Sequence, residues 1–339
     1  MQPEAGPQDA VPSSPARRPG SVRRTMTTDV WRVDVPQPAR IRLRGQDLVT
    51  ELDGRTRVLD QLAIDLTLDE VTGEVLHAEH PDLAPLVGAN VRRGWGKAVA
   101  AVFAAEQAQR TLRWSILEDL GAACLVSGFT HLLDGRLHEL IRQAHHAAGG
   151  SNLRRVDAQS DICVGWRVEG PVHAVAVEFG RSAIPIGGPA PAVWAGDPAG
   201  WHAVPDMPPG TLRRMRRLDT WPTDDGWALD SHFRDSAAID GDAVRPEQMV
   251  LHEYALAASV DNADRLASVT VEHMSLPWAG CPGAVPSAQL AVGTPLADLP
   301  ARARTELIGR DTCTHLSSTL RELADVVALR PNLPVNPAP

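Results

Sequence analysis

Two cysteines and two histidines in the second half of this 339-residue chain have the types and spacing needed for chemistry. Cys313 and His315 are two residues apart, Cys281 precedes them, and His252 lies further upstream. Thiolate sulfur and neutral imidazole are preferred zinc ligands, and they also serve as nucleophile and base in thiol-dependent enzymes. We therefore expect these four side chains to form one pocket, as catalytic residues, as the ligands of one zinc or iron ion, or as both.

The two site cysteines are each predicted to lie at the start of a helix. Pro282 directly follows Cys281, and proline is favoured at the first helical position. Cys313 lies where the last helix of the chain should begin. Free backbone N–H groups and the positive end of the helix dipole stabilise a thiolate at such a position. We therefore expect Cys281 and Cys313 to react faster than Cys124, which lies inside the apolar run Ala122–Val126.

The elements around these residues are predicted from hydrophobic periodicity. From His252 to Val260 the residues alternate in character, which indicates a strand with His252 on the same face as Tyr254. Asp261–Arg265 has the composition of a turn, and Leu266–His273 returns as the partner strand. Helices are predicted from Cys281 to Gly293, from Leu299 to Ile308, and from near Thr312 onward.

The first half presents the same order of strands followed by helices. Its strands are predicted at Gln61–Leu68 and Glu74–Glu79, and its helices at Leu83–Ala105 and Leu112–Leu133. Two short motifs of the first half also return in the second: Arg23-Arg24 returns as Arg216-Arg217, and Thr130-His131-Leu132 returns as Thr314-His315-Leu316. We therefore predict an α+β fold of two tandem pseudo-repeats, each an antiparallel sheet covered by its C-terminal helices.

Composition divides the chain into five segments. Residues 1–20 are rich in proline, alanine and arginine and are expected to be a disordered leader. Residues 21–148 form the first repeat, which we interpret as structural, and residues 211–328 form the second repeat, which carries the candidate site. The Gly/Pro-rich residues 149–210 connect the two repeats, and residues 329–339 are expected to be a disordered tail.

The overall composition argues against several partners. A net charge of −9 at pH 7 gives no electrostatic basis for binding nucleic acid. No apolar stretch is long enough to cross a membrane. Four cysteines without a signal-peptide pattern indicate the reducing cytoplasm.

Several other clusters are interpreted as ordinary structural features. The surface features are Arg213–Arg217, expected to be a solvated turn before a strand, Ser231–Ser236, expected to be salt-bridged surface, and the exposed pair Glu118-Asp119. Cys124 and Cys163 are interpreted as buried core thiols, because a small buried cysteine is common in protein interiors.

Short motifs across residues 21–328 resemble a bacterial family known as domain of unknown function 2889. In the second half these are His252-Glu253-Tyr254, Val260-Asp261, Leu276-Pro277, Cys281-Pro282 and Cys313-Thr314-His315-Leu316. In the first half they are Val22-Arg23-Arg24-Thr25, Leu117-Glu118-Asp119-Leu120 and Leu125-Val126-Ser127-Gly128. The resemblance implies a shared fold and carries no activity with it.

The order of elements is also similar to that of iron–sulfur cluster scaffold proteins. That resemblance implies that His252 or Glu253, with Cys281, Cys313 and His315, takes the cluster-ligand positions. This chain departs from the scaffold pattern, because histidine and tyrosine replace its first cysteine and its aspartate. The Cys/His order near the end is also reversed and split by Thr314. One metal ion held by two cysteines and one or two histidines remains the expectation.

Three classes of function remain open. The first is an enzyme that uses the Cys/His pocket, with or without zinc, on a small-molecule substrate. The second is a metal- or sulfur-handling accessory protein, and the third is a non-catalytic module for ligand binding or homodimer formation. The chain lacks a Gly-rich phosphate loop and a serine-hydrolase elbow in the required strand-to-helix setting, which argues against nucleotide and acyl-serine chemistry.

Overall fold

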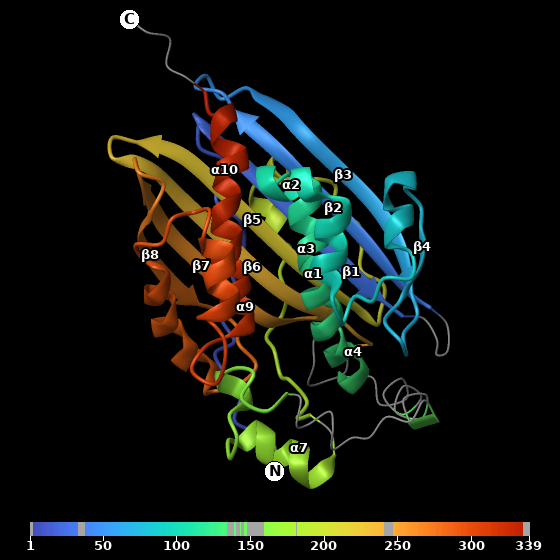
Figure 1. The fold of residues 1–339 in the computed structure, drawn as a ribbon. Helices are drawn as coiled ribbons and strands as arrows, with labels where there is room; N and C mark the ends of the chain where they lie inside the picture. Colours follow the sequence, from blue (N-terminus) through green and yellow to red (C-terminus); the bar gives the residue numbers. More distant parts are fainter. Residues whose placement is uncertain are drawn as a thin grey trace, which may run out of the picture.

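One antiparallel sheet runs through the middle of the molecule (Figure 1). The computed structural model describes residues 3–32, 38–133, 139, 143, 146–147, 159–180, 182–240 and 247–334. In this part of the chain, eight strands are hydrogen-bonded in the order β4-β3-β2-β1-β5-β6-β7-β8. The strands are β1 (Ser21–Trp31), β2 (Ala39–Thr50), β3 (Thr56–Leu68), β4 (Val75–Ala78), β5 (Thr211–Thr223), β6 (Gly226–Ala238), β7 (Gln248–Asp261) and β8 (Leu266–His273).

The α+β class and the antiparallel strands predicted from the sequence are confirmed, but the prediction of one sheet per half is wrong. β1 and β5 pair with each other at the centre, with Val22 opposite Thr220 and Trp31 opposite Thr211. The backbone N–H and C=O groups of each strand thereby satisfy those of the other, so neither half keeps a free edge at this position. The two halves share a single continuous sheet.

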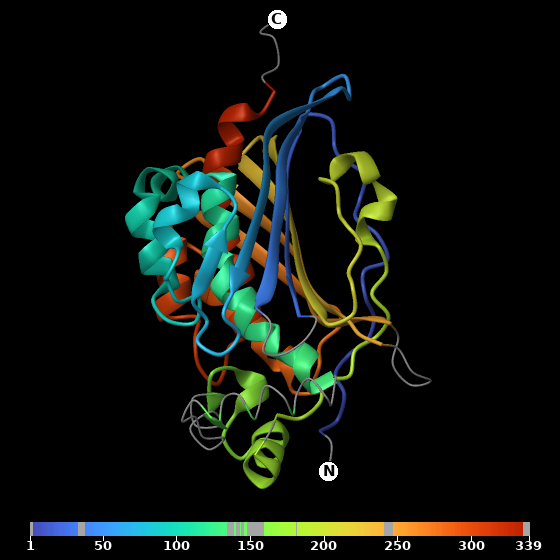
Figure 2. The ribbon, with the colours of Figure 1, turned by 90° about the vertical axis from the view of Figure 1, so that its right-hand side faces the viewer.

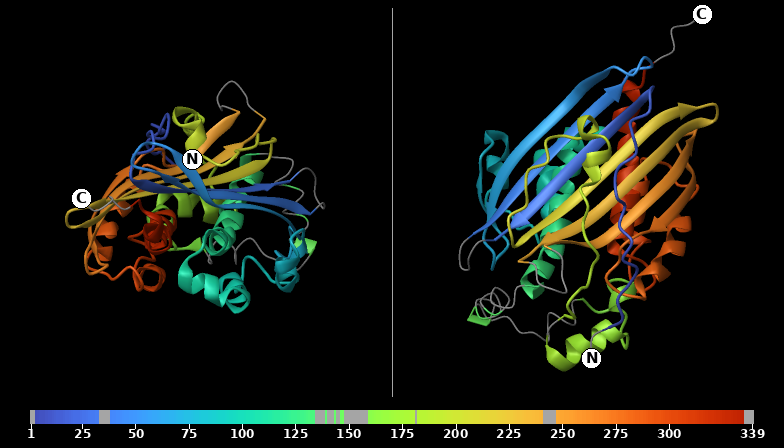
Figure 3. Two further views of the ribbon diagram at one scale, coloured as in Figure 1. Left: turned by 90° about the horizontal axis from the view of Figure 1, so that it is seen from above. Right: turned by 180° about the vertical axis from the view of Figure 1, so that it is seen from behind.

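Helices cover one face of the sheet and extended segments cover the other. Figure 1 shows α3, α9 and α10 across the near face, and Figure 2 shows the sheet between the helices and residues 182–210. From behind, the N-terminal segment and residues 182–210 cross the opposite face (Figure 3). The described α-helices are α1 (Trp95–Val102), α2 (Ala104–Gln109), α3 (Leu112–Val126), α4 (Gly128–Leu133), α7 (Pro171–Phe179), α8 (Leu299–Thr305), α9 (Thr314–Glu322) and α10 (Val326–Leu329). The 3-10 helices are η1 (Pro81–Leu86), η2 (Val164–Trp166), η3 (Val193–Gly196), η4 (Pro198–Gly200), η5 (Cys281–Ala291), η6 (Leu323–Asp325) and η7 (Arg330–Asn332).

Most of the elements predicted around the site are present, and one helix is of a different type. The predicted hairpin is β7 and β8, in which Tyr254 lies opposite His273. Cys313 is the N-cap residue of α9, as expected. Cys281 begins η5, which is a 3-10 helix and not the expected α-helix. Pro286 lies inside this segment and lacks an N–H group, so the hydrogen-bond ladder of an α-helix cannot continue through it.

The helices of the first half are shorter than predicted. The region from Leu83 to Ala105 contains η1, α1 and the start of α2, separated by breaks. Gly88 and Gly94 have backbone φ angles of 85° and 73°, which a right-handed helix cannot include. Over the described residues, no helix combines the length and apolar character needed to cross a membrane.

The two central strands carry arginines that are buried, not solvated. Residues Arg213 to Arg217 lie within β5, so the interpretation of this cluster as a solvated turn is wrong. The buried arginines of β1 and β5 are Arg23, Arg24, Arg213, Arg214, Arg216 and Arg217. Buried charges are tolerated when they are paired and hydrogen-bonded, and each of these guanidinium groups bonds at least one carboxylate.

The arginines that face the helices form what we call the helix-face network. Arg24 donates to Asp47 and to Asp325 of η6, at 2.8 and 3.0 Å. Arg216 donates to Asp119 of α3 and to Glu322 of α9, at 2.8 and 2.6 Å. The network consists of Arg24, Arg214 and Arg216 with Asp47, Asp119, Asp235, Glu322 and Asp325. It therefore joins helices of both halves to the middle of the sheet.

Asp119 is the carboxylate that bridges two of these arginines. It accepts from Arg216 at 2.8 Å and from Arg214 at 3.1 Å, and Ser318 of α9 also donates to it. Burial opposes ionisation of Asp119, but the two arginines outweigh burial and lower the pKa of this carboxyl. The expectation that Glu118 and Asp119 are simply exposed is wrong for Asp119, which is buried.

The N-terminal segment packs on the opposite face of the sheet. The expectation that residues 1–20 form a disordered leader is wrong for residues 3–20, in which the backbone N–H of Ser14 donates to the carbonyl of Val193 at 2.6 Å. The backbone N–H of Val11 donates to Glu253 at 3.0 Å, and Arg234 donates to the Val11 carbonyl at 2.6 Å. A Cβ atom on Gly6 would lie 2.3 Å from the carbonyl oxygen of Leu276, so only glycine fits there. These backbone bonds order a segment whose own composition could not fold it.

Replacing Asp119 with alanine should destabilise the fold strongly. Arg214 and Arg216 would lose a shared buried partner, and breaking a buried pair costs about 3–5 kcal/mol. Urea unfolding of the purified variant measures this loss. Asp206→Ala is the matched control, because Asp206 is exposed and lies outside the described helices and strands, so its replacement should change stability by less than about 0.5 kcal/mol. Equal losses for the two variants would contradict the importance of the network.

Glu322 should make stability depend on pH in the neutral range. Burial raises the pKa of Glu322 from 4.5 to about 7, although the bond from Arg216 opposes this rise. The folded chain then holds a proton that the unfolded chain releases, so this contribution to stability is lost as pH rises from about 4.5 to about 7. Subtracting the unfolding free energy of Glu322→Gln from that of the wild type at each pH isolates the effect. A difference that does not change over this range would contradict the prediction.

Candidate functional site

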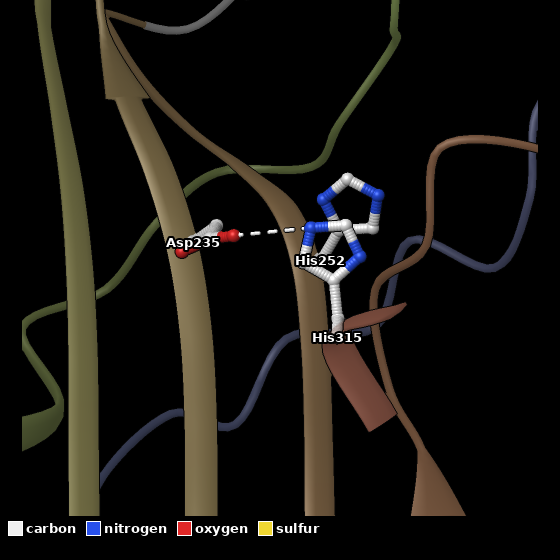
Figure 4. Close-up of side chains that lie close together, drawn as sticks. All are labelled: Asp235, His252 and His315. Carbon is white, nitrogen blue, oxygen red and sulfur yellow. Dashed lines mark ion pairs between the residues drawn. The ribbon is translucent and has the colours of Figure 1, made fainter. Parts of the chain in front are cut away.

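Three donor groups meet between β6, β7 and the first turn of α9 (Figure 4). One ligand atom each from Asp235, His252 and His315 lies within 4.8 Å of the other two, and all three residues are buried. We call this group the Asp–His–His triad. Among the described residues, it is the only set of three or more such donors that meets this criterion.

Strand pairing explains why two members of the triad are neighbours. Asp235 of β6 lies directly opposite His252 of β7. The register shifts immediately afterwards, because Ser236 pairs with Val250 and leaves Leu251 as the additional residue of a β-bulge. Bulges change the direction of nearby side chains and often occur next to active sites. The third member, His315, comes from the α9 start that the sequence predicts.

The two histidines present unpaired ring nitrogens. Their rings stack with centroids 3.7 Å apart and planes 18° apart. Nδ1 of His252 and Nε2 of His315 are buried and have no hydrogen-bond partner among the described residues. A buried polar atom without a partner costs about 1–3 kcal/mol, so two such atoms in stacked rings need an explanation.

Both imidazoles are held in the neutral form. Burial, with Arg214 nearby, lowers the pKa of His252 to about 3. Burial, reinforced by His252, also lowers the pKa of His315 well below its ordinary value. Neutral imidazole is the form that ligates a metal ion.

Asp235 is oriented by the helix-face network. Arg214 donates to both of its carboxylate oxygens at 2.8 Å. Burial raises the pKa of Asp235, whereas the two bonds from Arg214 act in the opposite direction. Oδ2 of Asp235 lies 3.4 Å from Nε2 of His315. A carboxylate oxygen can accept more than one hydrogen bond, so the Asp235 carboxylate keeps capacity for a further partner.

Cys313 lies on the other side of the His315 ring. Its sulfur is 3.7 Å from Nδ1 of His315. The sulfurs of Cys281 and Cys163 both lie near Gly165. They are 3.2 and 3.8 Å from the position that a Cβ atom of this glycine would occupy. Of the four residues predicted from the sequence, His252 and His315 therefore meet at the triad, whereas Cys313 and Cys281 lie outside it.

The expected activation of the two cysteines is wrong in direction. Burial raises the pKa of the Cys281 and Cys313 thiols, although backbone N–H groups of α9 lower that of Cys313. Desolvation of the thiolate thus outweighs the helix-start effect. Burial also raises the pKa of Cys124 and Cys163 to about 12.

Asp235 is the residue that the sequence interpretation placed incorrectly. The segment Ser231–Ser236 was interpreted as salt-bridged surface, but it lies buried within β6. Alternation in the sequence could have indicated a strand here. Phe233 and Asp235 share one face of β6, and His232 and Arg234 share the other. On the helix face, the guanidinium groups of Arg214 and Arg216 lie over the Phe233 ring.

Comparison with protein families gives one match, which lies within the second half of the chain and includes the triad. Residues 212–329 match the family described as protein of unknown function DUF2889. The match spans β5 to α10, about a third of the chain, and supports the family resemblance seen in the sequence. Neither the curated proteins nor the solved structures contain a significant match. The likeness to iron–sulfur scaffold proteins stays a prediction from element order.

Alkylation of the native chain should modify Cys163 first. Cys163 is half-buried, whereas Cys124, Cys281 and Cys313 are buried. Brief treatment with iodoacetamide followed by peptide mass spectrometry measures the order, and labelling in denaturant should be equal at all four positions. Faster labelling of Cys281 or Cys313 than of Cys163 would show that the helix-start effect outweighs burial after all.

Proposed function

We propose that the second half of this protein binds one divalent transition-metal ion through Asp235, His252 and His315. The main support is the pair of buried, unpaired imidazole nitrogens beside a carboxylate that retains capacity for a ligand bond. A metal ion would satisfy both nitrogens at once and remove the cost of leaving them unpaired. Binding would also require no titration of the rings, because they are already neutral.

The donor set favours zinc or ferrous iron. Two histidines and one carboxylate hold zinc in several hydrolases and hold iron in non-haem oxygenases, with further positions open to water or substrate. A bound zinc ion would supply Lewis-acid activation of water for reaction with a small molecule. Arg214 would orient the Asp235 carboxylate, and Cys313 would contact Nδ1 of the ligating His315.

A second candidate is a thiol-dependent enzyme without metal. The His315 ring lies between two groups. Its Nδ1 is 3.7 Å from the Cys313 sulfur, and its Nε2 is 3.4 Å from the Asp235 carboxylate. This is the order of nucleophile, base and orienting group in cysteine hydrolases. The raised pKa of the buried thiol favours the metal proposal over this one.

We also propose that the two halves descend from a duplicated unit. The strand order reads outward from the central pair as β1 to β4 on one side and β5 to β8 on the other. Each central strand carries a buried Arg-Arg pair, Arg23-Arg24 in β1 and Arg216-Arg217 in β5. In this proposal the first half is the scaffold and the second half keeps the site.

The metal proposal is tested by metal content. Chain purified without chelator and then exposed to zinc should retain about one equivalent after buffer exchange. His252→Asn should weaken zinc binding more than about 100-fold, because even second-shell changes weaken metal sites 10- to 100-fold. Elemental analysis and competition with a zinc chelator measure both quantities.

His202→Asn is the matched control for this experiment. His202 is also buried and its pKa is lowered to about 3, but both ring nitrogens are already paired, with Thr25 and Thr27 at 2.9 Å each. The control should lose stability and keep zinc. Equal loss of zinc in both variants, or no retention by the wild type, would contradict the proposal.

A further inference from the structure

A small cavity lies between α3 of the first half and α9 and η6 of the second half. Figure 1 shows α3 beside α9 and α10 on one face of the sheet, and Ser318 of α9 donates to Asp119 of α3 at 3.1 Å. About 20 Å³ of this cavity is open to a water-sized particle, and about 10–15 Å³ is enough to hold one. We call it the interhelix cavity. Its lining includes Ser115, Glu118 and Asp119 of α3, Arg321 and Glu322 of α9, and Asp325 of η6.

Arg321 lines this cavity with a guanidinium group that bonds no carboxylate among the described residues. It donates to the Ser318 hydroxyl at 2.9 Å, and its Nε is buried without any partner. Neighbouring arginines are paired, since Arg110 donates to Asp325 at 2.5 Å and Arg216 donates to Glu322 at 2.6 Å. A buried donor on a charged group is costly unless an acceptor satisfies it. Arg321 therefore requires an acceptor that the described residues do not supply.

Two further groups on the cavity wall can donate to the same acceptor. Oε2 of Glu322 accepts from Arg216, whereas its Oε1 is buried and has no partner among the described residues. Burial raises the pKa of Glu322 to about 7, so below that pH the carboxyl holds a proton, for which Oε1 is the free oxygen. The Ser115 hydroxyl accepts from Arg24 at 3.0 Å and, over the described part of the chain, donates to no acceptor. The wall thus offers a guanidinium N–H and two O–H groups.

We propose that the interhelix cavity binds one halide-sized anion, such as chloride, through Arg321, Ser115 and protonated Glu322. A halide ion accepts all three hydrogen bonds and neutralises the guanidinium charge, and bonds between ions and donors of this kind are the strong ones. Water is neutral and must also find acceptors for its own protons. Because the donors come from both halves, the anion joins α3 to α9. The proposal does not depend on metal binding by the triad.

Binding of the anion is coupled to uptake of one proton. An ionised Glu322 would repel the anion and could not donate to it, so the anion binds together with a proton from solvent at Oε1. The charged groups around this carboxyl are Arg216 of β5, Glu118 and Asp119 of α3, Arg321 beside it, and Asp325 of η6. Asp325 is itself paired with Arg24 and Arg110. Of the unpartnered atoms, Arg321 Nε and Glu322 Oε1 are the two that only the anion and its proton satisfy together.

The test measures melting temperature while chloride replaces gluconate at constant ionic strength, because gluconate is too large for the cavity. The full-length chain should be stabilised by chloride at about pH 6, with a shift that grows with the logarithm of chloride concentration. Above about pH 7 the apparent chloride affinity should fall about tenfold per pH unit, because one proton accompanies each anion. A crystal soaked in bromide should show an anomalous bromine peak beside Arg321.

Three variants make the result specific. Arg321→Gln should lose the chloride effect, whereas Arg93→Gln, which removes an exposed arginine from outside the cavity, should keep it. Glu322→Gln presents a neutral amide donor that does not titrate, so it should keep the chloride effect and lose its dependence on pH. Circular dichroism should confirm that the variants remain folded, and the bromide peak in the wild type needs no variant.

Four outcomes would overturn the proposal. A wild type with no chloride-specific shift and no bromine peak would mean that the cavity holds only water. An undiminished chloride effect in Arg321→Gln would place the anion elsewhere, for example on a metal ion at the triad. Equal loss in Arg93→Gln would show a general effect of surface charge. An affinity that is the same at about pH 6 and about pH 8 would exclude the proton on Glu322.

Discussion

The pairing of buried arginines with carboxylates at the β1–β5 seam is the interaction on which the rest of the structure depends. Arginine remains charged inside a protein, so each guanidinium group must find acceptors before the strand can be buried. The acceptors come from both sides of the sheet and from helices of both halves, such as Asp119 of α3 and Glu322 of α9. The layers cannot shift relative to one another without leaving a buried charge unpaired.

The same requirement positions the candidate site. Asp235 bonds Arg214, and Arg214 also bonds Asp119, so a carboxylate of the triad is connected to the central strands and to α3. The β-bulge after Asp235 and the N-terminal turn of α9 then bring His252 and His315 to that carboxylate. Site geometry is therefore a consequence of the charge pairing that stabilises the fold, and changes at distant members of the helix-face network should reach the site through Arg214.

Structure could be predicted from the sequence where apolar periodicity decides it. It could not be predicted where charge pairing decides it. The β7–β8 hairpin and the start of α9 follow from alternation and capping, which placed His252 and His315 correctly. Arg213–Arg217 and Asp235 have the composition of a surface, because nothing local reveals that their partners lie in other strands and helices. The ordered conformation of residues 3–20 also depends on partners far along the chain, such as Glu253.

The most direct test of this account is anomalous diffraction from crystals of the zinc-loaded chain, recorded on both sides of the zinc absorption edge. The account predicts one strong peak between Asp235, His252 and His315, with zinc–nitrogen distances of about 2.0–2.1 Å and a zinc–oxygen distance of about 2.0–2.2 Å. A triad without an anomalous peak in the loaded crystal, with both ring nitrogens still unpaired, would contradict it.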